Sequence, residues 1–147
     1  MTITIKRKKR VLYLCTGNSC RSQMAEAITN HQLGEVWSAV SAGTEPAGYV
    51  HPRALQVLGE IDIEHKGASK AVTEFQGQEF DLVVTVCDDA RETCPVWLGK
   101  EAKEHLGFRD PAQANGTEKE ILKVFREVRN QIQSQVPALL AEHTEED

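Results

Sequence analysis

Short apolar runs alternate with longer amphipathic stretches along this chain. Val11–Cys15 and Asp81–Cys87 are the clearest apolar runs; the first has β-branched and aromatic members, and the second is rich in β-branched residues. Such runs are typical of strands that are buried on both faces of a sheet. Two weaker segments, Val36–Ser41 and Lys103–Phe108, are expected to add two further strands.

Three segments have the periodicity of helices. The first spans Ser22–Leu33 and is expected to stop at Gly34, and the second spans Pro52–Gly59. The last begins at Thr117, which is predicted to form a capping box with Glu120. Its apolar positions recur at helical spacing at Ile121, Phe125, Val128 and Ile132. Pro137 is expected to end or kink this helix.

The alternation of strands and helices predicts an α/β fold with a parallel sheet and right-handed crossovers. We expect residues 1–147 to form a single domain, with a basic flank at 1–10 and an acidic tail at 142–147. In such sheets, ligands bind beyond the carboxyl ends of the strands. Cys15 and Cys87 both fall at the carboxyl end of a predicted strand.

The composition favours an ordinary globular protein. There are 17 Lys and Arg against 22 Asp and Glu, which gives a net charge of −5. No apolar run approaches the roughly 20 residues that span a bilayer, and the basic flank leads into an apolar run too short for a signal peptide. Four cysteines without a secretory signal indicate reduced thiols. We expect a cytoplasmic monomer with no nucleic-acid or membrane partner.

The most specific motif is a C-x5-R loop between the first strand and the first helix. A loop that enters a helix directs several backbone N–H groups toward one point, where they bind a tetrahedral oxyanion. Gly17 is expected to supply the positive φ or the close backbone approach that this loop needs. Arg21 can hold two oxyanion oxygens, and Ser22 can donate to the Cys15 sulfur, so that the thiolate of Cys15 is favoured. The predicted oxyanion-binding residues are Thr16, Gly17, Asn18, Ser19, Cys20, Arg21 and Ser22.

The segment C-T-G-N-S-C-R-S-Q-M-A-E resembles the active-site loop of low-molecular-weight protein tyrosine phosphatases and of the arsenate reductases that share their fold. The resemblance extends from Val11 to the last helix. It implies a four-stranded parallel sheet with helices on both faces, in a flavodoxin-like winding.

The segment from Cys87 to Pro95, C-x6-C-P, favours the reductases over the phosphatases. It is similar to the pattern of the thioredoxin-linked arsenate reductases. Reduction of arsenate to arsenite needs two electrons, which a thiol pair supplies when it becomes a disulfide. A third thiol can then carry the oxidation to the surface. The resemblance therefore implies Cys15 as nucleophile, followed by Cys87 and then Cys94, with thioredoxin as reductant and no cofactor. Cys20 is then left as a packing residue.

The Asp110-Pro111 pair suits a general acid on a stiffened loop, and Asp110 would protonate the departing oxygen. The phosphatases carry tyrosines after this pair, whereas Ala112, Gln113 and Ala114 follow here. The cysteine spacing does not match that of ordinary zinc sites, so no metal site is expected.

One position departs from the family. In some relatives a potassium ion lies beside the loop asparagine, held partly by an acidic side chain. An ungapped count back from Cys87 places Lys70 at that acidic position, after Ala68 and Ser69. Lys70 is therefore expected to support the loop, with its ammonium in place of the ion and in contact with Asn18. A surface lysine without this role is the alternative.

Two other functions remain open from the sequence. One is a low-molecular-weight phosphatase, and the other is an oxyanion-binding or redox-sensing module that does not turn over.

Overall fold

The structure is a computed structural model that describes residues 7–88, 97 and 99–144. Four parallel strands form one sheet in the order β2-β1-β3-β4. The strands are β1 (Lys9–Cys15), β2 (Trp37–Gly43), β3 (Leu82–Thr85) and β4 (Ala102–His105). The predicted four-stranded parallel sheet is confirmed, and its topology places β1 in the centre between β2 and β3.

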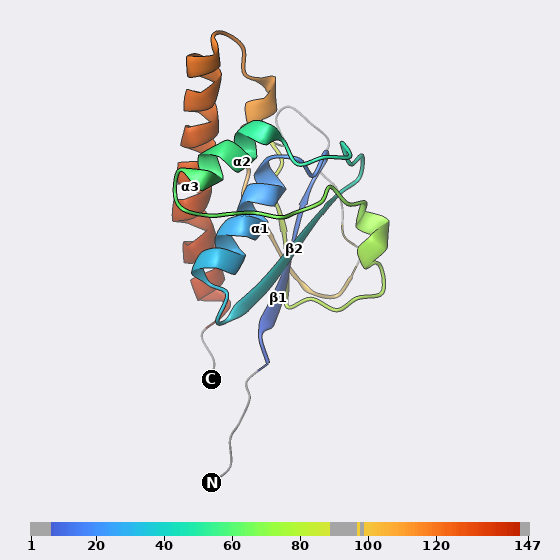
Figure 1. Ribbon diagram of the computed structural model, residues 1–147. Coiled ribbons are helices and arrows are strands. Elements are labelled where there is room, and N and C mark those ends of the chain that lie inside the picture. The colour runs from blue at the N-terminus through green and yellow to red at the C-terminus, as the bar shows by residue number, and fades with distance from the viewer. Residues whose placement is uncertain (1–6, 89–96, 98, 145–147) are drawn as a thin grey trace.

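Three α-helices pack on one face of the sheet (Figure 1). They are α1 (Arg21–Gln32), α2 (Pro52–Gly59) and α3 (Glu118–Glu142). The other face is covered by the short 3-10 helix η1 (Val72–Phe75), which the sequence pattern did not predict. A second 3-10 helix, η2 (Pro111–Gln113), precedes α3. Helices therefore lie on both faces, as expected, although one face has only a single 3-10 turn among the described residues.

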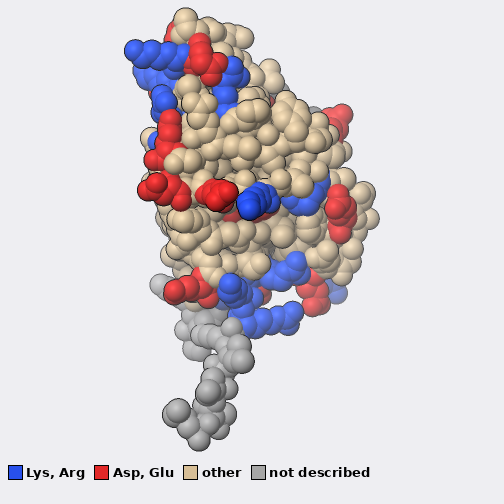
Figure 2. Space-filling view, in the orientation of Figure 1, with Lys and Arg blue, Asp and Glu red and all other residues tan. Residues whose placement is uncertain are grey.

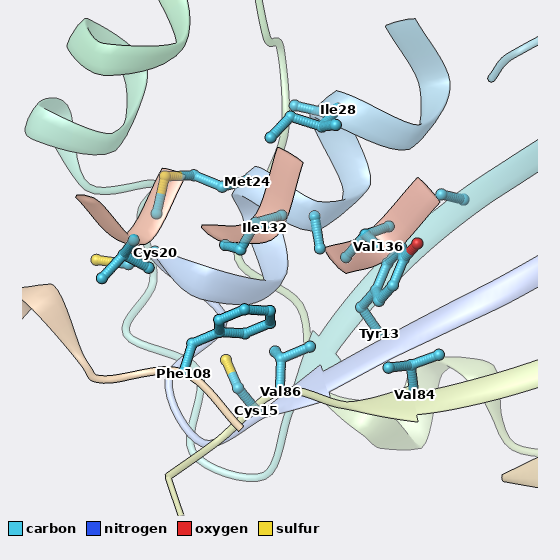
Figure 3. Close-up of a cluster of buried hydrophobic side chains, with 14 of the residues drawn as sticks. Tyr13, Cys15, Cys20, Met24, Ile28, Val84, Val86, Phe108, Ile132 and Val136 are labelled. Atoms are coloured by element: carbon cyan, nitrogen blue, oxygen red, sulfur yellow. The ribbon is translucent and has the colours of Figure 1, made fainter. Parts of the chain in front are cut away.

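The side chains of β1 are buried on both sides of the sheet, as the apolar run predicts. Tyr13 and Cys15 face the larger core beneath the α-helices, with Val11 beside them. Leu12 and Leu14 face the smaller core beneath η1. Figure 3 shows part of the larger core, where Cys15 lies close to Val86 and Phe108. The central strand is thus fixed from both sides, and its carboxyl end holds Cys15 in place.

The third and fourth strands are shorter than predicted, but their hydrogen bonding continues beyond the strand ends. The N–H of Val86 donates to the carbonyl of Leu14 at 2.9 Å, and the N–H of Leu106 donates to that of Thr85 at 2.8 Å. Phe108 donates to the carbonyl of Val86 at 3.3 Å. The chain therefore stays in register as far as the residues that precede Asp88 and Asp110.

The last helix begins as predicted but does not stop at Pro137. The N–H of Glu120 donates to Thr117 Oγ1 at 3.1 Å, and Glu120 Oε1 accepts from the N–H of Thr117 at 3.0 Å. The helix continues through Pro137 to Glu142, so the expectation that it could end there was wrong. An internal proline costs about 3 kcal/mol. Burial of Leu139 and Leu140 recovers about 1.5–3 kcal/mol for each side chain.

Charged side chains of both signs are interspersed with uncharged areas on the face in Figure 2. Among the described residues, no helix is both long and apolar enough to cross a membrane.

Candidate active site

The carboxyl end of β1 and the start of α1 are joined by a five-residue turn from Thr16 to Cys20. Cys15 is 2% exposed and is a free thiol. The turn, Cys15 and Arg21 line a pocket. The same pocket is lined by residues that follow β3 and β4 in the chain, namely Asp88, Arg109, Asp110, Gln113 and Asn115.

The carbonyl groups of the turn all accept hydrogen bonds from outside it. The carbonyl of Thr16 accepts from the N–H of Glu45 at 2.9 Å, and that of Gly17 accepts from the N–H of Ala47 at 2.8 Å. The carbonyl of Ser19 accepts from the N–H of His51 at 3.0 Å. The segment between β2 and α2 therefore holds the outer side of the turn.

The carbonyl of Asn18 accepts from Gln23 Nε2 at 3.1 Å, and that of Cys20 accepts from the N–H of Met24 in α1 at 2.8 Å. In a trans peptide, the N–H of the next residue points away from the carbonyl. Four outward carbonyls therefore direct four N–H groups inward, and together with the start of α1 these make a site for an anion. The inward N–H groups belong to Gly17, Asn18, Ser19 and Cys20.

The Cys15 sulfur accepts hydrogen bonds within this turn. The N–H of Asn18 lies 3.3 Å from Sγ, and Ser22 Oγ lies 2.9 Å from Sγ. Asn18 Nδ2 also donates to Ser22 Oγ at 2.9 Å. These groups stabilise a thiolate on Cys15, which is the form that acts as a nucleophile.

Arg21 is 3% exposed and connects the turn to the loop after β4. Its Nη1 donates to the carbonyl of Phe108 at 3.2 Å, and its Nη2 lies 3.7 Å from Asp110 Oδ2. Asp110 caps η2, since its Oδ1 accepts from the N–H of Ala112 at 3.0 Å. A guanidinium and a carboxyl group therefore meet at the pocket that Cys15 also lines.

Cys87 follows β3 and is fully buried in the same core cluster as Cys15. It is disulfide-bonded in this structure, and neither Cys15 nor Cys20 is its partner because both are free thiols. Cys94 lies outside the described residues.

Comparisons with known proteins agree with this geometry. The family model for low molecular weight phosphotyrosine protein phosphatases matches residues 10–147. The chain belongs to this phosphatase family.

The relatives that this chain matches include proteins named arsenate reductase. The chain is 44% identical to the arsenate reductase of Oceanobacillus iheyensis over 126 residues, which cover 85% of this chain and 90% of that protein. It is 42% identical to the arsenate reductase of Bacillus subtilis over 125 residues, which cover 84% and 89%.

Solved structures show the same likeness. An arsenate reductase in a phosphate-binding state superposes with a TM-score of 0.72 at 30% identity, and covers 92% of this chain and 99% of that one. The arsenate reductase of Archaeoglobus fulgidus has a TM-score of 0.70 at 31% identity, with 86% and 98% covered.

The role expected for Gly17 in this phosphatase-family loop was wrong. The positive φ of the turn, 48°, is at Asn18, and a Cβ on Gly17 would make an ordinary contact of 3.7 Å with Ser19 Oγ. The close approach is instead at Gly43, where a Cβ would lie 2.4 Å from the carbonyl oxygen of Thr16. An asparagine tolerates this backbone region because its side chain can form local hydrogen bonds.

Lys70 supports Asn18 in a different way from the expected one. The backbone N–H of Lys70 donates to Asn18 Oδ1 at 2.8 Å. Its ammonium instead donates to the carbonyl of Ala68 at 2.6 Å and lies 3.8 Å from Glu26 Oε1. The expected contact between the ammonium and Asn18 was therefore wrong, although the positive charge does lie next to a carboxylate.

Gln23 and His65 complete this network and were missed from the sequence. Gln23 is fully buried, and its Nε2 donates to Asn18 Oδ1 at 3.1 Å and to the carbonyl of Ala68 at 2.8 Å. Its Oε1 lies 2.8 Å from His65 Nε2. Burial lowers the pKa of His65. The only signal in the sequence is an uncharged polar residue on the buried side of the first helix.

Cys20 lies in the larger core, where Figure 3 shows it near Met24. Burial raises the pKa of the Cys20 thiol to about 12. This thiol stays protonated near neutral pH, so its side chain is a poor nucleophile.

Proposed function

We propose that this protein reduces arsenate to arsenite through a thiol–disulfide relay that involves Cys15, Cys87 and Cys94. The observation that carries the proposal is the Cys15 sulfur at the centre of a turn whose backbone donors point inward. The relatives named arsenate reductase, at 42–44% identity over most of the chain, support the choice of substrate.

The first step joins arsenate to the enzyme. Arsenate binds against the inward N–H groups and Arg21, and the Cys15 thiolate forms a bond to arsenic. One oxygen leaves as water with a proton from Asp110. Arsenic is still in its oxidised state after this step, so no electrons have yet been transferred.

The second step is the reduction. The Cys87 thiolate attacks the Cys15 sulfur, and the electron pair of the sulfur–arsenic bond moves to arsenic. Arsenite leaves, and a Cys15–Cys87 disulfide remains. The two thiols have supplied the two electrons.

The third step restores the nucleophile. Cys94 attacks Cys87, which releases the Cys15 thiolate and leaves a disulfide between Cys87 and Cys94. A dithiol protein such as thioredoxin reduces this disulfide. A structure in which Cys15 is a free thiol and Cys87 is disulfide-bonded is consistent with the state that this step leaves. The relay acts in a reducing compartment, and we place this single-domain protein in the cytoplasm as a monomer.

The deciding experiment measures oxidation of reduced thioredoxin when arsenate is added to the enzyme. The reductase should consume about one thioredoxin dithiol per arsenite formed, and Cys15→Ser should abolish the reaction. A parallel assay with glutathione and glutaredoxin identifies the reductant. No arsenite in either assay would refute the proposal.

A phosphatase is the second candidate, because the family model that matches is named for it. Hydrolysis of an aryl phosphate without arsenate reduction would establish this alternative. A weak hydrolysis beside arsenate reduction fits the proposal, since both reactions would use the same anion-binding turn. Phosphate binding with neither reaction would indicate a binding or sensing module.

A further inference from the structure

Arg109 lies at the pocket that the Cys15 turn lines and has no role in the chemistry above. It is one of the pocket-lining residues, and its side chain is exposed. It follows Arg21 as a second guanidinium at this pocket.

The backbone on both sides of Arg109 is fixed. Phe108 is 2% exposed, its N–H donates to the carbonyl of Val86, and its own carbonyl accepts from Arg21 Nη1 at 3.2 Å. On the other side, Asp110 precedes η2 and caps it. The backbone of Arg109 is thus held at the pocket by its neighbours.

The guanidinium of Arg109 makes no hydrogen bond or ion pair with any residue in the described part of the chain. Other arginines differ: Arg53 pairs with Glu118, and Arg126 pairs with Glu60. Arg21 is engaged with Phe108 and Asp110. The positive charge of Arg109 is therefore available to a ligand in the pocket.

The charges around the pocket indicate what the Arg109 guanidinium does there. Asp88 lines the pocket, and a thiolate on Cys15 adds a second negative charge. Arg21 offsets only one of these two charges, so the remaining charge opposes the approach of a dianion to the inward N–H groups. Arg109 offsets that repulsion, and a charge at the mouth of a concave site raises the local concentration of its counter-ion.

We propose that Arg109 is a specificity-determining residue that draws small, doubly charged tetrahedral oxyanions into the pocket. This inference rests on the proposed function for the identity of the natural anion. It assigns Arg109 to capture of the anion, and not to bond making or to contact with the reductant.

The test compares alkylation of Cys15 by iodoacetate, an anion, with alkylation by iodoacetamide, which is neutral. The reduced enzyme is used, and mass spectrometry follows the peptide that contains Cys15. The ratio of the two rates reports the local potential, because any change in thiolate content affects both reagents equally. Arg109→Ala should lower the ratio about threefold, Arg109→Glu about tenfold, and Arg109→Lys less than twofold. All differences should shrink in about 1 M salt.

A second measurement uses inorganic phosphate, which should protect Cys15 from iodoacetamide. Arg109→Ala should raise the phosphate concentration for half-protection about fivefold. Lys123→Ala is the matched control, because Lys123 is exposed on α3 and does not line the pocket. It removes the same charge and should leave both measurements unchanged.

An unchanged ratio and unchanged protection in Arg109→Ala and Arg109→Glu would overturn the inference. Slower oxidation of thioredoxin with an unchanged ratio would also overturn it, and would assign Arg109 to partner docking. If the ratio falls as expected but no arsenite forms, anion capture by Arg109 stands and the proposed function fails. The two ideas can therefore be separated.

Discussion

Ser22 Oγ lies 2.9 Å from Cys15 Sγ, and the surrounding hydrogen bonds set the direction of this contact. Asn18 Oδ1 accepts from the N–H of Lys70 and from Gln23 Nε2. The other end of the Asn18 amide, Nδ2, must therefore be the donor to Ser22 Oγ. Because Ser22 Oγ already accepts there, its own proton is available to the sulfur.

Replacement of Ser22 by alanine should reduce the reactivity of Cys15. A hydrogen bond to a charged group contributes about 1.5–3 kcal/mol, so the reaction of Cys15 should slow about tenfold or more. The rate of iodoacetamide alkylation of Cys15 at pH 7 measures this. Ser22→Thr keeps the hydroxyl and is the control. Equal rates in wild type and Ser22→Ala would show that the contact does not stabilise the thiolate.

Gly43→Ala should disturb the turn from Thr16 to Cys20, although Gly43 is far from this turn in the sequence. Its Cβ would lie 2.4 Å from the carbonyl of Thr16, so β2 and the turn must separate. We expect a loss of about 1–3 kcal/mol in the free energy of unfolding, together with weaker phosphate protection of Cys15. Urea unfolding measures the first effect.

Two matched glycines serve as controls for Gly43. Gly59→Ala meets nothing within 4 Å and should be neutral or slightly stabilising. Gly17→Ala would make an ordinary 3.7 Å contact and should keep phosphate binding. Loss of phosphate binding in Gly17→Ala, with binding retained in Gly43→Ala, would contradict the assignment of the close approach to Gly43.

Asp110→Asn should slow the first chemical step and leave the fold intact. Asparagine caps a helix as well as aspartate does, so η2 should persist. The loss of a general acid should reduce the single-turnover rate of arsenite formation by about 10²–10⁴. Phosphate protection should change by less than about twofold, since a general acid acts on the leaving oxygen and not on binding. A wild-type rate in a rapid-quench experiment near pH 7 would remove Asp110 from the mechanism.

Lys70 should make the enzyme indifferent to potassium. Its ammonium lies 3.8 Å from Glu26 Oε1, so the charge that a cation would supply is already present. The steady-state rate should be equal in sodium and potassium salts of the same ionic strength. Lys70→Asp should introduce a response to potassium, whereas Lys66→Ala, at an exposed lysine of the same segment, should not. A clear rise in the wild-type rate in potassium would contradict this.

Stability should fall as the pH drops through the range in which free histidine titrates. Burial lowers the pKa of both His51 and His65 below the ordinary value of 6.5. The unfolded chain therefore binds protons first as the pH falls, and the folded state loses stability between about pH 7 and 5. Melting temperatures at pH 7.5 and 5.5 measure this loss, which should be smaller in His65→Gln.

Carboxylates contribute to the pH dependence of stability in a separate, more acidic pH range. Arginine side chains lower the pKa of Glu60 and Glu118 below the ordinary value of 4.5. Their stabilisation is present above that value and is lost as the pH falls through the folded-state pKa.

For the histidines, a His65→Gln variant that loses as much stability as wild type between pH 7.5 and 5.5 would show that His65 does not contribute.

Much of the fold could be predicted because its signals are local. The run Val11–Cys15 is apolar at every position, and the strand is buried on both faces. The capping pair Thr117 and Glu120 lies within one turn of α3. The helix end expected at Pro137 was wrong because tertiary burial of the residues around it outweighs one missing hydrogen bond.

The support of the turn could not be predicted because its contacts join distant segments. Gly43 approaches Thr16 across neighbouring strands, and Lys70 reaches Asn18 through a backbone N–H that any residue except proline would provide. Side-chain chemistry therefore gives no signal for these contacts. The C-x5-R loop was found because its residues are contiguous, whereas its outer support is formed only by the folded chain.

The outward carbonyls of the turn have a consequence for how this fold changes its chemistry. Besides Arg21, the donors for the anion are peptide groups, which have no titratable proton and which no substitution except one to proline removes. The anion receptor is thus independent of the groups that decide what happens to the anion. Those groups lie on the chain after β3 and on the loop that carries Arg109 and Asp110. Hydrolysis and reduction can therefore evolve on one scaffold by exchange of these two segments, while the receptor itself stays the same.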